Sequence, residues 1–218
     1  MPSVKNKKGE VALKRSEVPR ATLGRIPSYL KYLKSLPQDV RTISATSLAK
    51  GLGLGEVQVR KDLSAVSGAG RPKIGYYTAE LIASLEVFLG CGDQSGAIII
   101  GAGKLGRALL DYQGFSEYGL EILAAFDTAV QEEQCSQAGK RILPMGQLER
   151  FCRNHAAKIG IITVPAASAQ SVCNRLVENR ISAIWCFAPC QLSVPEGIPV
   201  QYENMALSLA HLKQRIEV

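Results

Sequence analysis

Residues 97–106 constrain the fold of this chain more than any other stretch. Ala97–Ile100 is one alanine followed by three isoleucines, which is typical of a strand buried on both faces of a parallel sheet. The sequence Gly-Ala-Gly-Lys-Leu-Gly follows directly, and residues 107–112 then fit a helix. A strand, a G-x-G-x-x-G turn and a helix in this order predict an α/β fold that binds a dinucleotide.

Each glycine of the turn has a physical role in such a site. The first makes the tight turn, the second lets the backbone approach a pyrophosphate, and the third lets the helix pack closely on the strand. The N-terminus of the helix presents free N–H groups and a positive dipole to the phosphates. The predicted cofactor-binding residues here are Gly101, Ala102, Gly103, Lys104, Leu105 and Gly106. The alternative is a glycine turn that binds no ligand.

Asp127 closes a second expected strand, residues 120–127. A carboxylate at this point can bind the ribose hydroxyls of adenosine and would repel a 2′-phosphate, so it predicts NAD(H) rather than NADP(H). The acid follows the turn by somewhat more than the usual ~20 residues. A long loop over residues 114–119 accounts for the difference.

Strand and helix patterns alternate through the rest of this half of the chain. Strands are expected at 141–143, 158–164 and 182–187, with helices at 145–154 and 166–178 between them. Alternation of this kind predicts a doubly wound parallel sheet of the Rossmann type over residues 81–202. Ligands bind at the carboxyl ends of such strands, so six residues should border the pocket: Thr163, Val164, Pro165, Phe187, Ala188 and Pro189. Tyr112 lies near the same edge, and the pattern leaves open whether it is a pocket or a core residue.

The charge of the chain is unevenly distributed. Residues 1–80 hold 15 Lys and Arg against 6 Asp and Glu, a net charge of +9, whereas residues 81–218 hold 11 against 13, a net charge of −2. A basic front half predicts a polyanionic partner for that half. No apolar run approaches the ~18 residues of a membrane span. With no signal peptide and no clustering of the cysteines and histidines, we expect a cytoplasmic protein without membrane contact, zinc site or disulfide framework.

The basic half has the pattern of a winged helix-turn-helix domain, expected over residues 1–80 with residues 1–18 disordered. One helix is expected within residues 20–36, a second after its N-cap Ser44, and a third over residues 56–67 beyond a glycine-rich turn. The third helix places Lys61 opposite its apolar stripe. Residues 68–77 fit the wing, whose basic tip can enter a minor groove, although an ordinary surface turn is the alternative. The predicted DNA contacts are Ser44, Gln58, Arg60, Lys61, Ser64, Arg71 and Lys73.

The last helix, about residues 203–216, carries an apolar stripe after the sheet is already complete. The stripe consists of Met205, Leu209, Leu212 and Ile216. It needs a partner, which is either its own domain or a second subunit.

Taken together, these segments resemble the Rex-type redox-sensing transcriptional repressors over nearly the whole chain. The matching segments are residues 19–27, 58–64, 75–76, 101–110, 112–115, 124–127, 163–166 and 187–189. The resemblance implies a homodimer whose C-terminal helix, residues 203–218, is swapped between subunits. It also implies binding to A·T-rich inverted repeats in double-stranded DNA, with release when NADH replaces NAD⁺.

Several positions depart from the family pattern. Well-known members link an arginine, the equivalent of Tyr112 and an aspartate of the swapped helix, where this chain has Lys31, Tyr112 and Ala206. Leu207 replaces an aromatic residue near the nicotinamide, and Lys73 stands where many relatives have a glycine in the wing. These departures affect the coupling between the nucleotide and DNA sites rather than the binding of DNA or nucleotide.

Two other functions compete with a repressor. An NAD-dependent oxidoreductase with a basic extension would need a positioned acid or base, yet no tyrosine here is followed four residues later by lysine. His155 and His211 lie in a connecting segment and in the last helix, so neither is expected at the carboxyl edge of the sheet. A CoA-binding or other nucleotide module would share the glycine turn, but the Asp127 carboxylate would have a smaller role in it. We therefore expect a DNA-binding repressor and not an enzyme.

Overall fold

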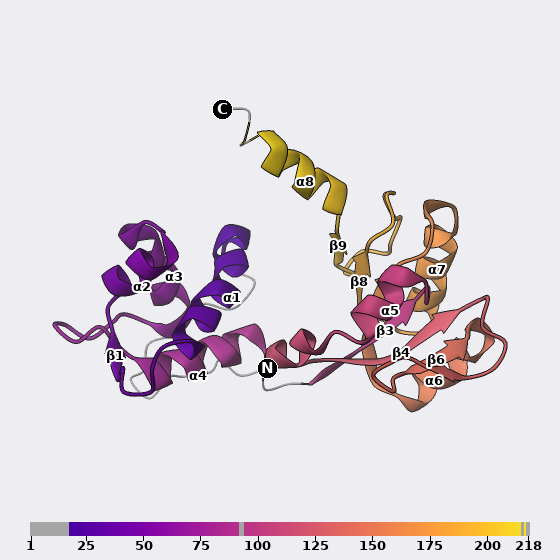
Figure 1. Cartoon of the computed structure of the whole chain (residues 1–218), viewed down its shortest axis with the longest axis horizontal. Coiled ribbons are helices and arrows are strands. Elements are labelled where there is room, and N and C mark those ends of the chain that lie inside the picture. Colours follow the sequence, from indigo (N-terminus) through magenta and orange to yellow (C-terminus); the bar gives the residue numbers. More distant parts are fainter. Residues whose placement is uncertain (1–17, 92–93, 215, 217–218) are drawn as a thin grey trace. The chain divides into compact units, whose positions relative to one another are not determined.

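The computed structural model describes residues 18–91, 94–214 and 216, and Figure 1 labels most of their helices and strands. It divides the chain into two compact units, Met1–Asp93 and Gln94–Val218. The boundary lies beyond the expected residue 80 because helix α4, Thr78–Leu89, buries Leu81 and Leu85 in the core of the first unit. The disorder expected for residues 1–18 lies outside the described residues apart from Val18, which is buried.

The first unit packs four helices beside a two-stranded antiparallel sheet. Its elements are α1 (Arg20–Lys34), β1 (Thr42–Ile43), α2 (Ala45–Leu52), α3 (Glu56–Ser67), β2 (Tyr76–Tyr77) and α4 (Thr78–Leu89). Apolar residues at helical spacing point to one core, as Val59, Leu63 and Val66 of α3 do. The strands pair Thr42 with Tyr77 and Ile43 with Tyr76, and an isolated bridge between Arg71 and Gly75 closes the wing.

The turn between α2 and α3 has the chemistry that the sequence predicts. The Ser44 hydroxyl accepts a hydrogen bond from the Ser47 N–H at 2.9 Å, which confirms Ser44 as the N-cap of α2. Gly53 ends α2 in the left-handed region, with φ of 64°. Together with the β1–β2 pair, α2 and α3 form the winged helix-turn-helix.

The second unit is built on a seven-stranded sheet with the order β5-β6-β4-β3-β7-β8-β9. All neighbours are parallel except the edge pair β5–β6. Its strands are β3 (Ser95–Ile100), β4 (Leu120–Asp127), β5 (Gln134–Cys135), β6 (Arg141–Pro144), β7 (Ala157–Ile162), β8 (Ala183–Cys186) and β9 (Val200–Tyr202). The helical segments are α5 (Lys104–Leu110), η2 (Gln113–Tyr118), η3 (Met145–Gln147), α6 (Leu148–Asn154), α7 (Ala166–Glu178) and α8 (Met205–Gln214).

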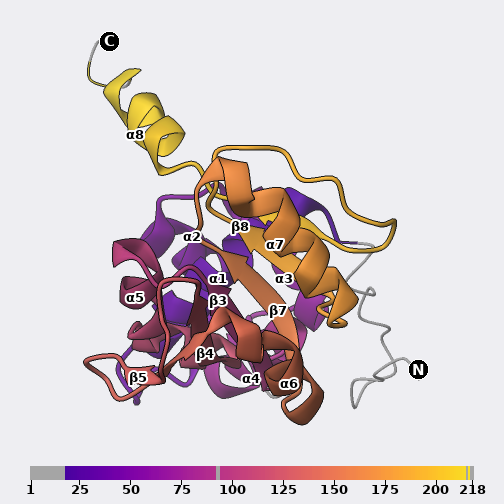
Figure 2. The same ribbon diagram turned by 90° about the vertical axis from the view of Figure 1, so that its right-hand side faces the viewer.

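Helical segments cover both faces of this sheet, as Figure 2 shows. Ile98 and Ile100 of β3 point to one face and pack in a cluster with residues of α6 and α7. Ala97 and Ile99 point to the other face, where Leu110 of α5 lies. Alternation along a strand thus buries every residue of the apolar run, which confirms a doubly wound sheet.

Strand β3 is the first strand of this sheet along the chain and lies in its middle. The chain continues through β4 to β6 on one side of β3, and then through β7 to β9 on the other. The carboxyl ends of β3 and β7 therefore flank the switch point at which such folds bind ligands. The short strands β1, β2, β5 and β9 were not predicted, because two or three residues carry no readable alternation.

Candidate functional site

The glycine-rich turn joins β3 to α5 at the carboxyl edge of the second unit's sheet. Gly101 has a φ of 104°, a conformation that side chains rarely allow, and its N–H donates to the Phe126 carbonyl at 2.7 Å. The Thr163 hydroxyl donates to the Gly101 carbonyl at 2.7 Å. The first glycine is thus held from both neighbouring strands, at the switch point.

The other two glycines of the turn lie in opposite surroundings. A Cβ on Gly106 would lie 1.9 Å from the Gly101 carbonyl oxygen, so only glycine lets α5 start this close to β3. A Cβ on Gly103 would meet no atom within 4 Å. The middle of the turn therefore exposes its backbone, while the end of the turn is packed against β3.

Arg107 stabilises the turn, a role that its position in the sequence does not indicate. Its Nε donates to the Ala102 carbonyl at 2.8 Å, and its Nη2 reaches Gln134 Oε1 at 3.5 Å. From the sequence alone, a basic residue in a short helix cannot be distinguished from one that points into solvent. The contact of the Arg107 guanidinium with the turn is seen only in the folded structure.

Asp127 ends β4 beside the turn, as predicted. Its Oδ2 accepts a hydrogen bond from the Ala102 N–H at 2.6 Å, and its Oδ1 accepts from the Ala129 N–H at 2.8 Å. A carboxylate has about four acceptor positions, so each oxygen keeps capacity for a further donor. The half-buried side chain is oriented by two backbone groups and can bind a pair of hydroxyls.

Two further predicted segments follow neighbouring strands at the same edge. The Thr163 N–H donates to the Ile100 carbonyl at 2.9 Å, and the Phe187 N–H donates to the Ile162 carbonyl at 2.9 Å. These bonds continue the pairing of β3 with β7 and of β7 with β8. Pro165 is the N-cap of α7 and is exposed. Thr163–Pro165 and Phe187–Pro189 therefore border the site together with the glycine turn.

Tyr112 is not a core residue, because 60% of its surface is exposed. It begins a row of aromatic side chains in which each ring lies at an angle to the next. The centroid separations are 5.0 Å for Tyr112–Phe115, 5.9 Å for Phe115–Trp185 and 4.6 Å for Trp185–Phe187. The Trp185 indole N–H donates to Glu203 Oε1 at 3.1 Å, just before α8. The row links Tyr112 to the start of the last helix, which no sequence spacing shows.

The outer face of α3 carries the polar residues that the sequence placed there. Arg60, Lys61 and Ser64 are exposed, and Arg60 forms an ion pair with Glu56 one turn earlier. Gln58 is exposed as well, but its Nε2 donates to Asp62 Oδ1 at 2.9 Å. One of the predicted DNA contacts is thus tied to a residue of the core.

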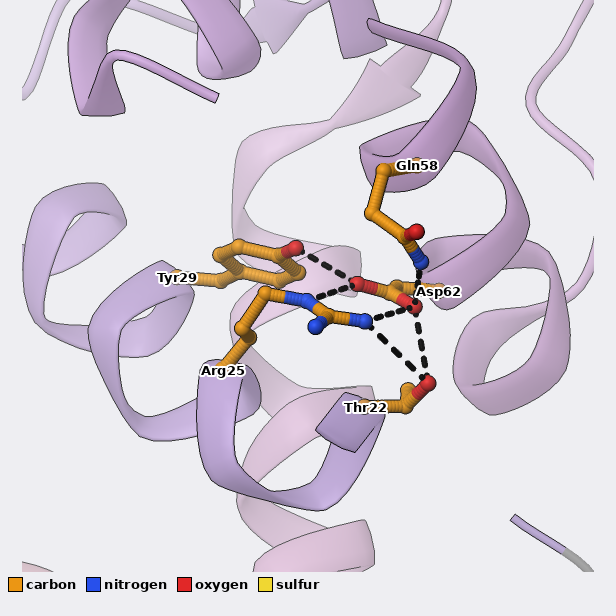
Figure 3. Close-up of polar contacts among 5 residues, drawn as sticks. All are labelled: Thr22, Arg25, Tyr29, Gln58 and Asp62. Carbon is orange, nitrogen blue, oxygen red and sulfur yellow. Dashed lines mark hydrogen bonds and ion pairs between the residues drawn. The ribbon is translucent and has the colours of Figure 1, made fainter. Parts of the chain in front are cut away.

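Asp62 is the centre of a buried polar cluster that joins α1 to α3 (Figure 3). Its side chain is only 1% exposed and accepts five hydrogen bonds. Arg25 donates twice, from Nε at 2.7 Å and from Nη2 at 3.0 Å. The hydroxyls of Thr22 and Tyr29 donate at 2.9 and 2.6 Å, and Gln58 supplies the fifth bond. No sequence pattern indicates this cluster, because its members are scattered over two helices.

The cluster keeps Asp62 ionised. Burial opposes the charge, but the hydrogen bonds from Arg25, Tyr29, Thr22 and Gln58 outweigh it and lower the pKa of Asp62 to about 2. Burial, reinforced by the bond to the carboxylate, raises the pKa of Tyr29 to about 12. At neutral pH the cluster therefore holds an aspartate, an arginine and a neutral tyrosine.

The two basic residues of the wing lie in different environments. The Arg71 guanidinium stacks over the Tyr77 ring at 4.4 Å and its Nη2 lies 3.2 Å from Glu80 Oε2. Lys73 is exposed and has a φ of 65°. Glycine adopts the left-handed conformation of Lys73 without strain. Arg71 fixes the base of the wing, and Lys73 extends from it.

Helix α8 buries none of its residues. Its predicted apolar stripe is exposed, from 54% at Leu212 to 67% at Leu209 within the helix, and Leu207 is 50% exposed. None of the described helices is long and apolar enough to cross a membrane. The described part of the chain also contains no group of three metal-binding side chains.

Two family models match the chain. One, described as "Putative DNA-binding protein N-terminus", matches residues 17–64, and the other, described as "CoA binding domain", matches residues 93–190. The first match includes α1, α2 and most of α3. The second includes the sheet from β3 to β8 with the glycine turn.

Curated relatives match over most of the chain. A protein named redox-sensing transcriptional repressor Rex from Treponema denticola is 40% identical over 205 residues, covering 91% of this chain and 95% of the relative. The protein of the same name from Porphyromonas gingivalis is 37% identical over 209 residues, covering 95% and 96%.

Solved structures agree with these relatives. The structure of RSP in complex with β-NAD⁺ and operator DNA superposes with a TM-score of 0.84 at 32% identity, covering 91% of this chain and 92% of RSP. RSP in complex with β-NADH gives a TM-score of 0.81 at 31% identity, covering 92% and 94%. RSP is a Rex-family repressor.

Proposed function

The chain belongs to the Rex family of redox-sensing transcriptional repressors, and on this premise we propose that it binds operator DNA and releases it when NADH replaces NAD⁺. The observation that carries the proposal is the presence, in one chain of this family, of a winged helix-turn-helix and of a glycine turn at the switch point of a doubly wound sheet. It acts on chromosomal DNA, and therefore in the cytoplasm.

The nucleotide site is the carboxyl edge of the second unit's sheet. The exposed backbone at Gly103 leaves room for a pyrophosphate, and the packed Gly106 holds α5 against β3. Thr163–Pro165 and Phe187–Pro189 border the other side of the switch point. NAD(H) contributes the redox state of its nicotinamide, and the residues of the chain bind and orient the dinucleotide.

Asp127 favours NAD(H) over the other nucleotides that a glycine turn can hold. Its remaining acceptor positions suit the two ribose hydroxyls of adenosine, and its charge repels a 2′-phosphate. CoA carries a phosphate on its adenosine ribose, so the same argument disfavours it, although the matching family model is described as a CoA-binding domain. We therefore infer NAD(H) as the cofactor.

The DNA site is the outer face of α3 together with the wing. Lys61, Arg60 and Ser64 are exposed on a helix that fits the major groove, and Ser44 lies at the start of α2. Lys73 extends from the wing and reaches the adjacent minor groove. The net charge of +9 over residues 1–80 supplies the general attraction to phosphates.

The exposed stripe of α8 supports a homodimer. Helix α8 buries none of its residues within this chain, and its apolar side chains would be covered by a second copy through exchange of the helix. Two copies place two recognition helices on one operator. An inverted repeat, A·T-rich as in the relatives that the sequence resembles, matches that symmetry.

The oxidoreductase alternative has less support. His155 follows α6, at the edge of the sheet opposite the glycine turn, and its ring stacks on Phe151 at 3.9 Å. His211 lies in α8 and is exposed. The named relatives are transcriptional repressors rather than enzymes.

Coupling between nucleotide and DNA runs through packing rather than through a charged latch. Ala206 has no carboxylate to pair with Lys31, so the aromatic row from Tyr112 to Phe187 and the link from Trp185 to Glu203 carry the signal to α8. NADH can release DNA only if it binds the DNA-free form more tightly, and the effect is reciprocal.

The test is a titration of operator DNA with the protein at saturating NAD⁺ and then at saturating NADH. An operator selected from a random duplex pool provides the probe. We expect NADH to weaken binding by roughly 5- to 150-fold. Equal affinities would show that the chain kept the fold of the family and lost its switch.

A further inference from the structure

We propose that Asp62 is a positioning residue for base recognition. It fixes the side-chain amide of Gln58 so that the amide oxygen faces the DNA, and Gln58 then selects a base with an amino group in the major groove, adenine or cytosine. This inference rests on the proposed binding of DNA through α3 and names the base class that one residue of that helix reads.

The Gln58 amide is held in one direction. Gln58 Nε2 lies 2.9 Å from Asp62 Oδ1, and Figure 3 shows the nitrogen turned toward the carboxylate and the oxygen turned away. An ionised carboxylate only accepts hydrogen bonds. A flipped amide would bring two oxygens together with no proton between them. The amide must therefore keep its NH₂ group on Asp62.

Asp62 is held in place by α1 and cannot move with the Gln58 side chain. Arg25 holds both carboxylate oxygens in a two-point contact, and Tyr29 and Thr22 each hold one of them. The side chain is 1% exposed, so water cannot replace these donors. Because Arg25, Tyr29 and Thr22 belong to α1, the amide of an exposed residue on α3 is anchored to the core of the unit.

An amide oxygen that points away from Asp62 can accept a hydrogen bond from a base. In the major groove, adenine presents the donor N6 and cytosine the donor N4, whereas guanine N7 and O6 and thymine O4 are acceptors. The Gln58 oxygen is attracted by the first two bases and repelled by the others. Adenine also offers N7 to the second N–H of the amide, so we expect it to rank first.

The experiment begins with an operator selected from a random duplex pool by the intact protein. Every base pair of one half-site is then replaced in turn, and affinities are measured for the wild type and for Gln58→Ala. We expect one position at which the wild type prefers adenine or cytosine by about 5- to 100-fold and at which Gln58→Ala shows no preference. A Gln58-dependent position that prefers guanine or thymine would overturn the proposal.

Replacement of single atoms in the DNA tests the same contact without changing the protein. Where the Gln58-dependent base is adenine, purine lacks its N6 amino group and keeps N7. Wild-type protein should lose most of its preference with purine, and Gln58→Ala should not distinguish the two duplexes. A wild-type affinity unaffected by loss of the amino group would refute an outward oxygen.

The role of Asp62 is separated from simple stability by a matched pair of variants. Asp62→Asn keeps the shape of the side chain and lets the Gln58 amide flip, so the preference at the Gln58-dependent position should fall several-fold. Leu85→Val trims an apolar side chain in the core of the same unit, outside the Asp62 cluster, so it should lower stability and leave the base preference intact. Equal loss of preference in both variants would reduce Asp62 to a structural role.

A measurement on the wild type decides the case if Asp62→Asn does not fold. Hydrogen exchange of the Gln58 side-chain NH₂, followed by NMR on the full chain without DNA, should be slowed relative to that of Gln113, an exposed glutamine of η2. Equal exchange rates would overturn the anchoring. If the selection yields no preferred sequence, the proposed DNA-binding function fails as well, whereas a selected operator that is indifferent to Gln58→Ala refutes this inference alone.

Discussion

The two units of this chain build their functional surfaces in opposite ways. In the first unit a buried ionised group, Asp62, fixes the orientation of α3 and of one side chain on its outer face. In the second unit the site is shaped by backbone, because Gly101 is held by main-chain and hydroxyl contacts and Gly106 packs directly on its carbonyl. Among the described residues, the polar side chains that are buried (Thr22, Asp62 and Thr78) all belong to the first unit.

This difference makes each unit sensitive to a different change. A charge cluster fails when its charge is removed or neutralised, since its partners are then left buried without compensation. A backbone turn fails when a side chain is added where the main chain passes close by.

Removal of the buried carboxylate should have the largest effect. Asp62→Ala leaves Arg25 without its buried partner, so the free energy of unfolding of the first unit should fall by about 3–5 kcal/mol. Amide hydrogen exchange resolved by unit provides the measurement, with the second unit unaffected. The control is Glu133→Ala, which removes an exposed ion pair of 2.6 Å with Arg141 and should change stability little. Comparable losses of stability in Asp62→Ala and Glu133→Ala would contradict a special role for the buried carboxylate.

Addition of one methyl group to the turn should affect the second unit next. Gly106→Ala places a Cβ against the Gly101 carbonyl, so it should destabilise the second unit by up to about 3 kcal/mol and abolish NADH binding. Gly103→Ala is the matched control, because its Cβ meets open space and should leave stability unchanged. Calorimetric titration with NADH and thermal unfolding report both effects. Normal NADH binding by Gly106→Ala would refute the packed turn.

Acid should weaken the first unit through the same carboxylate. Asp62 has a folded pKa of about 2, below its unfolded value of 3.8. A depressed pKa contributes stability that is complete above the unfolded value and lost as the pH falls through the folded value. The first unit should therefore lose about 2 kcal/mol between pH 4 and 2. Asp62→Asn should lack this loss. If that variant loses as much stability between pH 4 and 2 as the wild type, other groups cause the loss.

The wing should show the smallest effect on stability. Lys73 has a φ of 65°, and glycine adopts this conformation without strain but loses more entropy on folding. Lys73→Gly should therefore change stability by no more than about 1 kcal/mol, while the salt slope of DNA binding flattens by about one. Lys73→Asn removes the same charge in a residue that tolerates this conformation, so it should flatten the slope equally. A steeper or unchanged salt slope would remove Lys73 from the DNA contact.

Most of the fold can be predicted from the sequence, since it depends on patterns along short segments. The apolar run before Gly101, the helical stripes and the Ser44 cap each report local structure, and the alternation of strands and helices predicts the doubly wound sheet. The boundary between the units is less accessible to this reasoning. Helix α4 belongs with the first unit because Leu81 and Leu85 pack into the core of that unit. An apolar stripe in the sequence does not show which core will cover it.

Short segments of the sequence set the chemistry that each site offers: a glycine turn followed by an acid, and a basic face on a third helix. The way in which those groups are held depends on the folded chain. Asp62 joins Arg25 and Gln58 across two helices, Arg107 returns to the turn, and Trp185 connects the aromatic row to Glu203. Such contacts depend on the relative placement of elements in space, which packing of the whole core sets and which no spacing along the chain encodes.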